Sequence, residues 1–80
     1  MRYLNLEELG ALARHVREEA GLSQAETAQR IGSSQSNVSA AEKGKSSRYM
    51  SVALSIIEEI GGKRIEGPLY GVKDEEDTTE

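Results

Sequence analysis

The sequence predicts an all-α fold, and three observations support this. Apolar residues recur at three- and four-residue spacings in four successive segments, which is the period of an amphipathic helix. Asn or Ser residues suited to N-capping stand before the first three segments, and glycines follow all four. The chain has 80 residues, which is the length of one small domain.

The first predicted helix covers about residues 6–20. Asn5 can cap its N-terminus, and Glu8 stands three residues later in the arrangement of a capping box. Gly21 is expected to end the helix, because a left-handed residue costs least without a side chain. The face expected to point inward carries Leu9, Leu12, Ala13, Val16 and Ala20.

The second predicted helix begins after Ser23, which forms a capping box with Glu26, and stops at Gly32. Its inward residues are Ala28 and Ile31. It is separated by only three residues, Gly32-Ser33-Ser34, from the next helix, so that the two helices form a tight corner.

The third predicted helix has Ser34 as N-cap and continues to Gly44. Its apolar face is thin, with only Val38 and Ala41. A helix so polar is not a central core element, so a requirement other than packing selects its outward side chains. The fourth predicted helix covers about residues 47–60, with Met50, Ala53, Leu54, Ile57 and Ile60 expected to point inward.

The chain divides into three predicted regions: a helical domain over residues 1–62, an extended segment or hairpin over 63–73, and a disordered acidic tail over 74–80. The net charge of −4 is uneven, because five acids and no base stand in that tail. Residues 30–48 carry four basic residues against Glu42 alone. Local charge therefore leaves nucleic acid open as a partner.

Several kinds of chemistry are not expected. The chain has no Cys, which excludes disulfides, cysteine-ligated zinc and thiol catalysis, and its lone His15 cannot build a multi-histidine metal site. We see no nucleophile–base pair or phosphate loop, and no apolar run of about 18 residues that would span a membrane. We therefore predict no catalytic residues, no metal and no cofactor, and a cytoplasmic protein.

The tight corner has the layout that reads DNA, because a major groove about 12 Å wide admits one helix. LSQAETAQRIG and VSAAEKGK, five residues apart, followed by ALSIIEEIGG, resemble the central signature of the Cro/C1-type (XRE-like) helix–turn–helix family over about residues 9–61. The recognition helix is similar to that of lambdoid phage repressors. This resemblance implies a compact four- to five-helix bundle like that of lambda repressor.

The resemblance also implies roles for individual residues. Gln35 would pair with the N6 and N7 groups of an adenine, Ser36 would donate to a purine edge, and Ala40 would meet a thymine methyl. Gln24 would touch a phosphate and brace Gln35. The implied base contacts are Gln35, Ser36, Asn37 and Ala40, and the implied phosphate contacts are Gln24, Ser39, Lys43, Lys45 and Arg48.

Three positions depart from the family pattern. Ala40 replaces the frequent Arg or Gln, which would make direct base readout modest. Thr27 and Ala41 stand where the family has large apolar residues, which would thin the packing beneath the recognition helix. Ile56, Ile57 or Tyr49 could fill that volume. Glu42 is expected to pair with a neighbouring basic residue, for which Arg14 and Arg17 are candidates.

The resemblance implies a DNA-binding transcriptional regulator, expected to be a repressor that binds a palindromic operator on double-stranded DNA as a homodimer. Six apolar residues exceed the needs of one small core and are expected to form the dimer contact: Val52, Ile56, Ile65, Leu69, Tyr70 and Val72. Two alternatives stay open. The chain could be an antitoxin that binds a toxin through its C-terminal segment, or a protein-interaction module without DNA binding.

Overall fold

The computed structural model describes residues 4–63 and confirms the all-α class, with no strand in this range. Helices α1 (Leu6–Glu19), α2 (Gln24–Ile31) and α3 (Gln35–Lys43) follow one another closely. A 3₁₀ turn, η1 (Ser47–Tyr49), leads into α4 (Met50–Ser55), which continues directly as the π-helical turn η2 (Ile56–Ile60). The predicted extended segment and acidic tail, apart from Lys63, lie outside the described residues.

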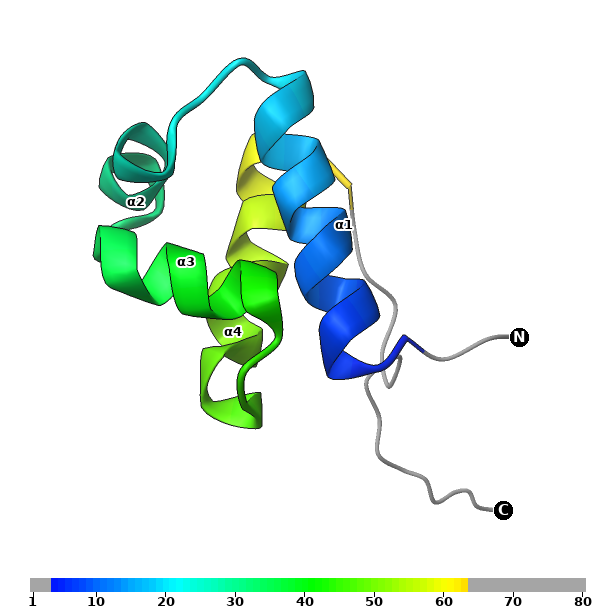
Figure 1. The fold of residues 1–80 in the computed structure, drawn as a ribbon. Coiled ribbons are helices and arrows are strands. Elements are labelled where there is room, and N and C mark those ends of the chain that lie inside the picture. Colours follow the sequence, from blue (N-terminus) through cyan, green and yellow to red (C-terminus); the bar gives the residue numbers. More distant parts are fainter. Residues whose placement is uncertain (1–3, 64–80) are drawn as a thin grey trace.

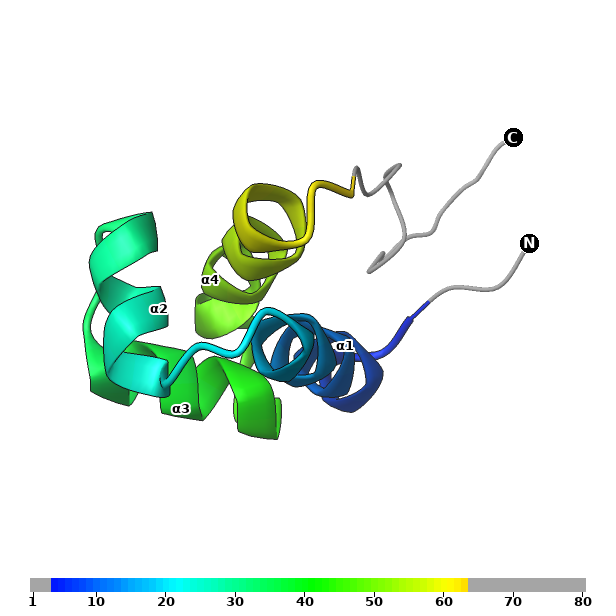
Figure 2. The same cartoon turned by 90° about the horizontal axis from the view of Figure 1, so that it is seen from above.

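The helices form two packed pairs (Figure 1). Helix α1 lies alongside α4 and η2, while α2 and α3 pack against each other at the corner and cover one side of that first pair. Helix α3 also packs against α1 and α4. In Figure 2 the two ends of the described chain lie on the side of the molecule away from α2, so the corner is free of both.

The helix ends follow the predicted capping signals. Asn5 accepts a hydrogen bond from the backbone of Glu8 at 2.7 Å, and the Glu8 carboxylate accepts one from the backbone of Asn5 at 3.0 Å. Ser23 and Glu26 form the same box, with distances of 2.8 and 3.0 Å. Hydrogen bonds from the backbone and hydroxyl of Ser23 lower the pKa of the Glu26 carboxyl. These local contacts set where α1 and α2 begin.

Gly32 makes the corner between α2 and α3. Its φ of 71° lies in the left-handed region, where a side chain is unfavourable. The backbone N–H of Ser33 then donates to the carbonyl of Ala28 at 2.8 Å, which closes the end of α2. Ser34 caps α3 immediately afterwards, through a hydrogen bond of 3.2 Å from the backbone of Asn37.

The core is aliphatic, and most of the predicted inward residues lie in it or against it. Ala20 was predicted wrongly: it is the C-cap of α1 and is exposed, because the helix ends before its side chain can reach the core. Leu12, Ile31, Met50, Leu54 and Ile60 are partly buried against the core. The buried apolar residues are Leu9, Ala13, Val16, Ala28, Val38, Ala41, Ala53, Ile56 and Ile57.

Ile56 corrects the predicted dimer contact. It is 0% exposed, so its side chain offers no surface to a second protomer. The turn η2 packs against both α1 and α2, and for this reason the two adjacent residues Ile56 and Ile57 are both buried. Ile56 therefore fills space in the core, which is the other role predicted for it. Val52 is half-buried and packs against the core.

Two features mark the packing around α2 and α3. Thr27 is fully buried, and its hydroxyl has no hydrogen-bond partner among residues 4–63. Gly10 lies where α1 crosses α3, and a Cβ on it would come within 2.4 Å of the carbonyl oxygen of Ala41. The two helices approach this closely because Gly10 has no side chain.

Candidate nucleic-acid interface

The outward face of α3 is polar and accessible. Gln35 and Ser36 in its first turn are exposed, and Lys43 in its last turn is exposed as well. Gln35, Ser39 and Lys43 are spaced four residues apart, so they follow one face of the helix. Asn37, Ser39 and Ala40 are half-buried. The predicted base-contacting residues thus occupy the exposed N-terminal part of α3 and the half-buried turn that follows.

Hydrogen bonds within the corner involve some of these side chains but leave Gln35 free. The Asn37 amide donates to the Ser33 hydroxyl at 3.2 Å, and the Ser36 hydroxyl lies 3.2 Å from that of Ser34. Within residues 4–63 the Gln35 side chain makes no hydrogen bond. Its amide therefore keeps both its donor and its acceptor for a ligand, the pair that adenine recognition requires.

A buried ion pair, here called the Arg17–Glu42 clasp, joins α1 to α3. The Nε and Nη2 atoms of Arg17 donate to the two carboxylate oxygens of Glu42 at 2.5 and 3.0 Å, and the side chains are 12% and 4% exposed. The hydrogen bond to Glu42 raises the pKa of Arg17, although burial acts to lower it. Arg17 Nη1 also donates to the carbonyl of Leu22 at 2.8 Å.

The structure distinguishes between the two predicted partners of Glu42. Arg17 is the partner, whereas Arg14 forms an exposed pair with Glu18 on its own helix at 3.0 Å. The Gln24 amide, at the start of α2, donates to Glu42 Oε1 at 3.1 Å instead of bracing Gln35 as expected. Glu42 therefore holds together α1, α2 and α3.

The three basic residues among the predicted phosphate contacts lie at the C-terminal end of α3 and beyond it. Lys43, Lys45 and Arg48 are all exposed. The Arg48 guanidinium lies 5.5 Å from the centre of the Tyr49 ring, within the range of a cation–π contact. The predicted phosphate contacts thus lie at the start of α2 (Gln24), on α3 (Ser39 and Lys43), and in the loop and 3₁₀ turn that follow it (Lys45 and Arg48).

A polar notch of about 230 Å³ opens between α1, α2 and α3, and three of its lining residues, Arg14, Arg17 and Glu42, were not among the predicted site residues. Arg14 lines this notch although it was not considered as a site residue. Its three-residue spacing from Arg17 was a usable signal, because that spacing places both residues on neighbouring positions of one helix face. The notch is lined by Arg14, Arg17, Gln24, Ser39, Glu42 and Lys43.

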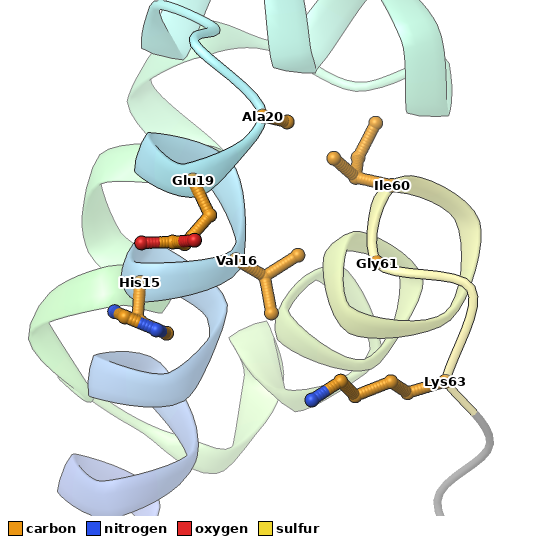
Figure 3. Close-up of a pocket in the computed structure, with 7 residues that line it drawn as sticks. All are labelled: His15, Val16, Glu19, Ala20, Ile60, Gly61 and Lys63. Atoms are coloured by element: carbon orange, nitrogen blue, oxygen red, sulfur yellow. The ribbon is translucent and has the colours of Figure 1, made fainter.

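A second depression, a groove of about 320 Å³, lies between the C-terminal half of α1 and the end of η2 (Figure 3). Val16 points across it toward Gly61, and the Lys63 side chain extends back toward α1. His15 and Glu19 stand on the α1 side. Within residues 4–63 no group of three or more His, Cys, Asp or Glu could hold a metal ion, and no helix could span a membrane.

Comparison with known families covers the same part of the chain. A family model described as a helix-turn-helix domain matches residues 8–58, which run from α1 into η2 and make up more than half of the chain. No curated protein and no solved structure matches the chain significantly.

Proposed function

The chain belongs to the Cro/C1-type helix–turn–helix family, and from this premise we propose that it is a transcriptional repressor that binds a specific sequence of double-stranded DNA. A domain of this kind indicates DNA binding and transcriptional regulation, and the family is typically non-enzymatic.

The observation that carries the proposal is the free carboxamide of Gln35, exposed at the start of a helix that has little other reason to be polar. It would form two hydrogen bonds to the N6 and N7 groups of an adenine. Ser36 would donate to the neighbouring purine, and the methyl of Ala40 would meet a thymine methyl. Asn37 would make a weaker contact, since its amide already donates to Ser33.

Phosphate contacts would position the helix without adding sequence information. We assign them to Gln24, Ser39, Lys43, Lys45 and Arg48. The chain is acidic overall, but Glu42, which lines a notch with Gln24, Ser39 and Lys43, is neutralised by Arg17. The face around α3 therefore presents mainly unneutralised basic side chains to the DNA backbone.

We further propose that two copies bind a palindromic operator, because one short helix makes few base contacts and two half-sites about 34 Å apart combine their binding free energies. Occupying a promoter in this way would block transcription. Of the proposed dimer residues other than Ile56, only Val52 lies in the described part of the chain, where it is half-buried. Ile65, Leu69, Tyr70 and Val72 lie outside the described residues.

The test is selection of binding sites from a random DNA pool at two salt concentrations. We expect a palindrome with an adenine at a contacted position to be enriched. Gln35→Ala should weaken binding to it about 10- to 100-fold, which corresponds to the ~1–3 kcal/mol of a good bidentate contact. Gln29→Ala is the matched control, because it removes an equally exposed carboxamide from α2.

The other outcomes separate the alternatives. Absence of enrichment at low salt, with circular dichroism showing a folded helical protein, would contradict sequence-specific binding and favour an interaction module. An antitoxin would enrich an operator as well, but it would also form a stable complex with a co-expressed toxin. A repressor alone would not form that complex.

A further inference from the structure

The polar notch between α1, α2 and α3 has a neutral floor. The Arg17–Glu42 clasp forms this floor, and its two hydrogen bonds satisfy both carboxylate oxygens. The other two charged residues of the notch, Arg14 and Lys43, are both positive. With the clasp neutral, the notch carries a net positive charge, which favours an anion as its ligand.

The notch also offers hydrogen-bond donors that the described chain leaves free. A Gln amide has two N–H groups, and Gln24 uses one of them on Glu42. Within residues 4–63 the hydroxyl of Ser39 and the ammonium group of Lys43 make no hydrogen bond. An anion with several oxygens could therefore accept from Gln24, Ser39 and Lys43 together, without breaking the clasp.

Arg14 forms only a weak ion pair that would compete with such an anion. Its Nε atom is 3.0 Å from Glu18, but the two side chains are 63% and 52% exposed. Exposed pairs at this helical spacing contribute only about 0.3–0.5 kcal/mol, because water screens them. The Nη groups of Arg14 take no part in that pair and remain available.

The position of the notch along α3 matches the dimensions of DNA. Ser39 and Lys43 lie on the same face as Gln35, about 6 and 12 Å further along the helix at ~1.5 Å per residue. A major groove is about 12 Å wide. With Gln35 on a base edge in the groove, Lys43 would therefore reach the sugar–phosphate backbone at the groove wall.

We propose that the notch binds one backbone phosphate of DNA and that Arg14 is a phosphate-binding residue of this protein. The inference rests on the proposed DNA binding and adds to it a ligand site and a residue on α1. The two non-bridging oxygens of the phosphodiester accept from Arg14 and Lys43 on one side and from Gln24 and Ser39 on the other. Glu18 competes with the phosphate for Arg14.

The experiment measures the affinity of the full-length protein for its selected duplex by fluorescence anisotropy between 50 and 200 mM salt. Loss of one phosphate contact lowers the magnitude of the slope of log K against log salt by about 0.9, or by about 1.8 when each of two copies on the palindrome loses one. We expect Arg14→Gln to show this loss and to weaken binding several-fold without changing the preferred bases. Lys63→Gln is the matched control, since it removes the same charge from the groove between α1 and η2.

A second pair of variants tests the competition by Glu18. Glu18→Gln should strengthen DNA binding, because it releases Arg14 from its only ion pair in the described chain. Glu58→Gln changes the net charge equally at an exposed position on η2 and should have a smaller effect. Equal effects of the two substitutions would contradict the proposed competition.

The failure of this inference differs from the failure of the proposed function. If the wild type binds its duplex and Arg14→Gln has the same salt slope and affinity as Lys63→Gln, Arg14 contacts no phosphate and only this inference is overturned. If the folded wild type binds no duplex at low salt, both are overturned. Because Arg14 is exposed, we expect the variant to keep the wild-type thermal midpoint.

Discussion

Two parts of this domain are stabilised by different interactions. The half formed by α1, α4 and η2 buries large aliphatic side chains, among them Leu9, Ile56 and Ile57, each at most 1% exposed. The half formed by α2 and α3 buries mainly small residues, and the Arg17–Glu42 clasp anchors it to α1. Apolar burial is non-directional, whereas the clasp has a set geometry. The comparison indicates that one half supplies stability while the other supplies a defined position for α3.

The reason for this division is the polar outer face of α3. With exposed side chains given over to Gln35, Ser36 and Lys43, the helix has only Val38 and Ala41 to bury. Small inward residues let its backbone come close to α1 at Gly10. A close approach and a buried ion pair then replace the aliphatic bulk that α3 lacks.

The largest effect should come from breaking the clasp. Glu42→Ala leaves the Arg17 guanidinium buried without its counter-charge, and we expect the free energy of unfolding to fall by about 3–5 kcal/mol, measured in urea. Glu18→Gln removes the exposed partner of Arg14 and is the control, with an expected loss of at most ~0.5 kcal/mol. Equal losses of unfolding free energy for the two substitutions would show that the buried clasp stabilises the fold no more than an exposed ion pair does.

A companion variant keeps this prediction testable if Glu42→Ala does not fold. Replacing both partners, Arg17→Met with Glu42→Leu, removes the uncompensated charge and substitutes apolar packing. Such replacements of buried ion pairs are often neutral or stabilising. We therefore expect the double variant to be more stable than Glu42→Ala, while Gln24 loses its acceptor.

A smaller loss of stability should follow from adding a side-chain atom at Gly10, where α1 and α3 come close together. Alanine in place of glycine inside a helix normally stabilises it by about 1 kcal/mol. At Gly10 the added Cβ meets backbone carbonyl oxygens of Ala41 and Glu42 at 2.4 and 2.7 Å. We expect Gly10→Ala to lower the free energy of unfolding by about 1–3 kcal/mol, the usual cost of overpacking. A thermal midpoint above that of the wild type would contradict the close approach.

The smallest effect should be a gain of stability at Thr27. Its buried hydroxyl has no hydrogen-bond partner in the part of the chain that the structure describes, and valine has nearly the same shape without the polar atom. We expect Thr27→Val to raise the free energy of unfolding by about 1 kcal/mol, because the cost of burying an unpaired group disappears. Thr27→Ala also removes the hydroxyl but leaves a void, so it should be less stable than Thr27→Val. A Thr27→Val variant less stable than the wild type would indicate that the hydroxyl has a partner.

How much was predictable depends on how far along the chain the determining contacts reach. The helix starts at Asn5 and Ser23 rest on partners three residues away, and the corner at Gly32 rests on backbone conformation. Such signals can be read from a short window of sequence. The exposed position of Gln35 was predictable in the same way, from the thin apolar face of the third helix.

Longer-range contacts were predicted only in part. Ile56, the neighbour of the inward-facing Ile57, was predicted as a dimer contact because it belongs to six apolar residues that exceed the needs of one small core. Only the packing of η2 against α1 and α2 together buries both residues. Likewise, the choice between Arg14 and Arg17 as the partner of Glu42 depends on how α1 crosses α3, which their positions on α1 leave open.

The sequence by itself therefore determined the four helices, their caps, the corner at Gly32 and the polar character of α3. These features depend on hydrogen bonds and backbone preferences within a few residues. Only the tertiary structure decided that Arg17 pairs with Glu42, that Gln24 joins them, and that Arg14, Ser39 and Lys43 line one notch. Those relations join residues far apart in the chain, and the crossing of helices brings them together.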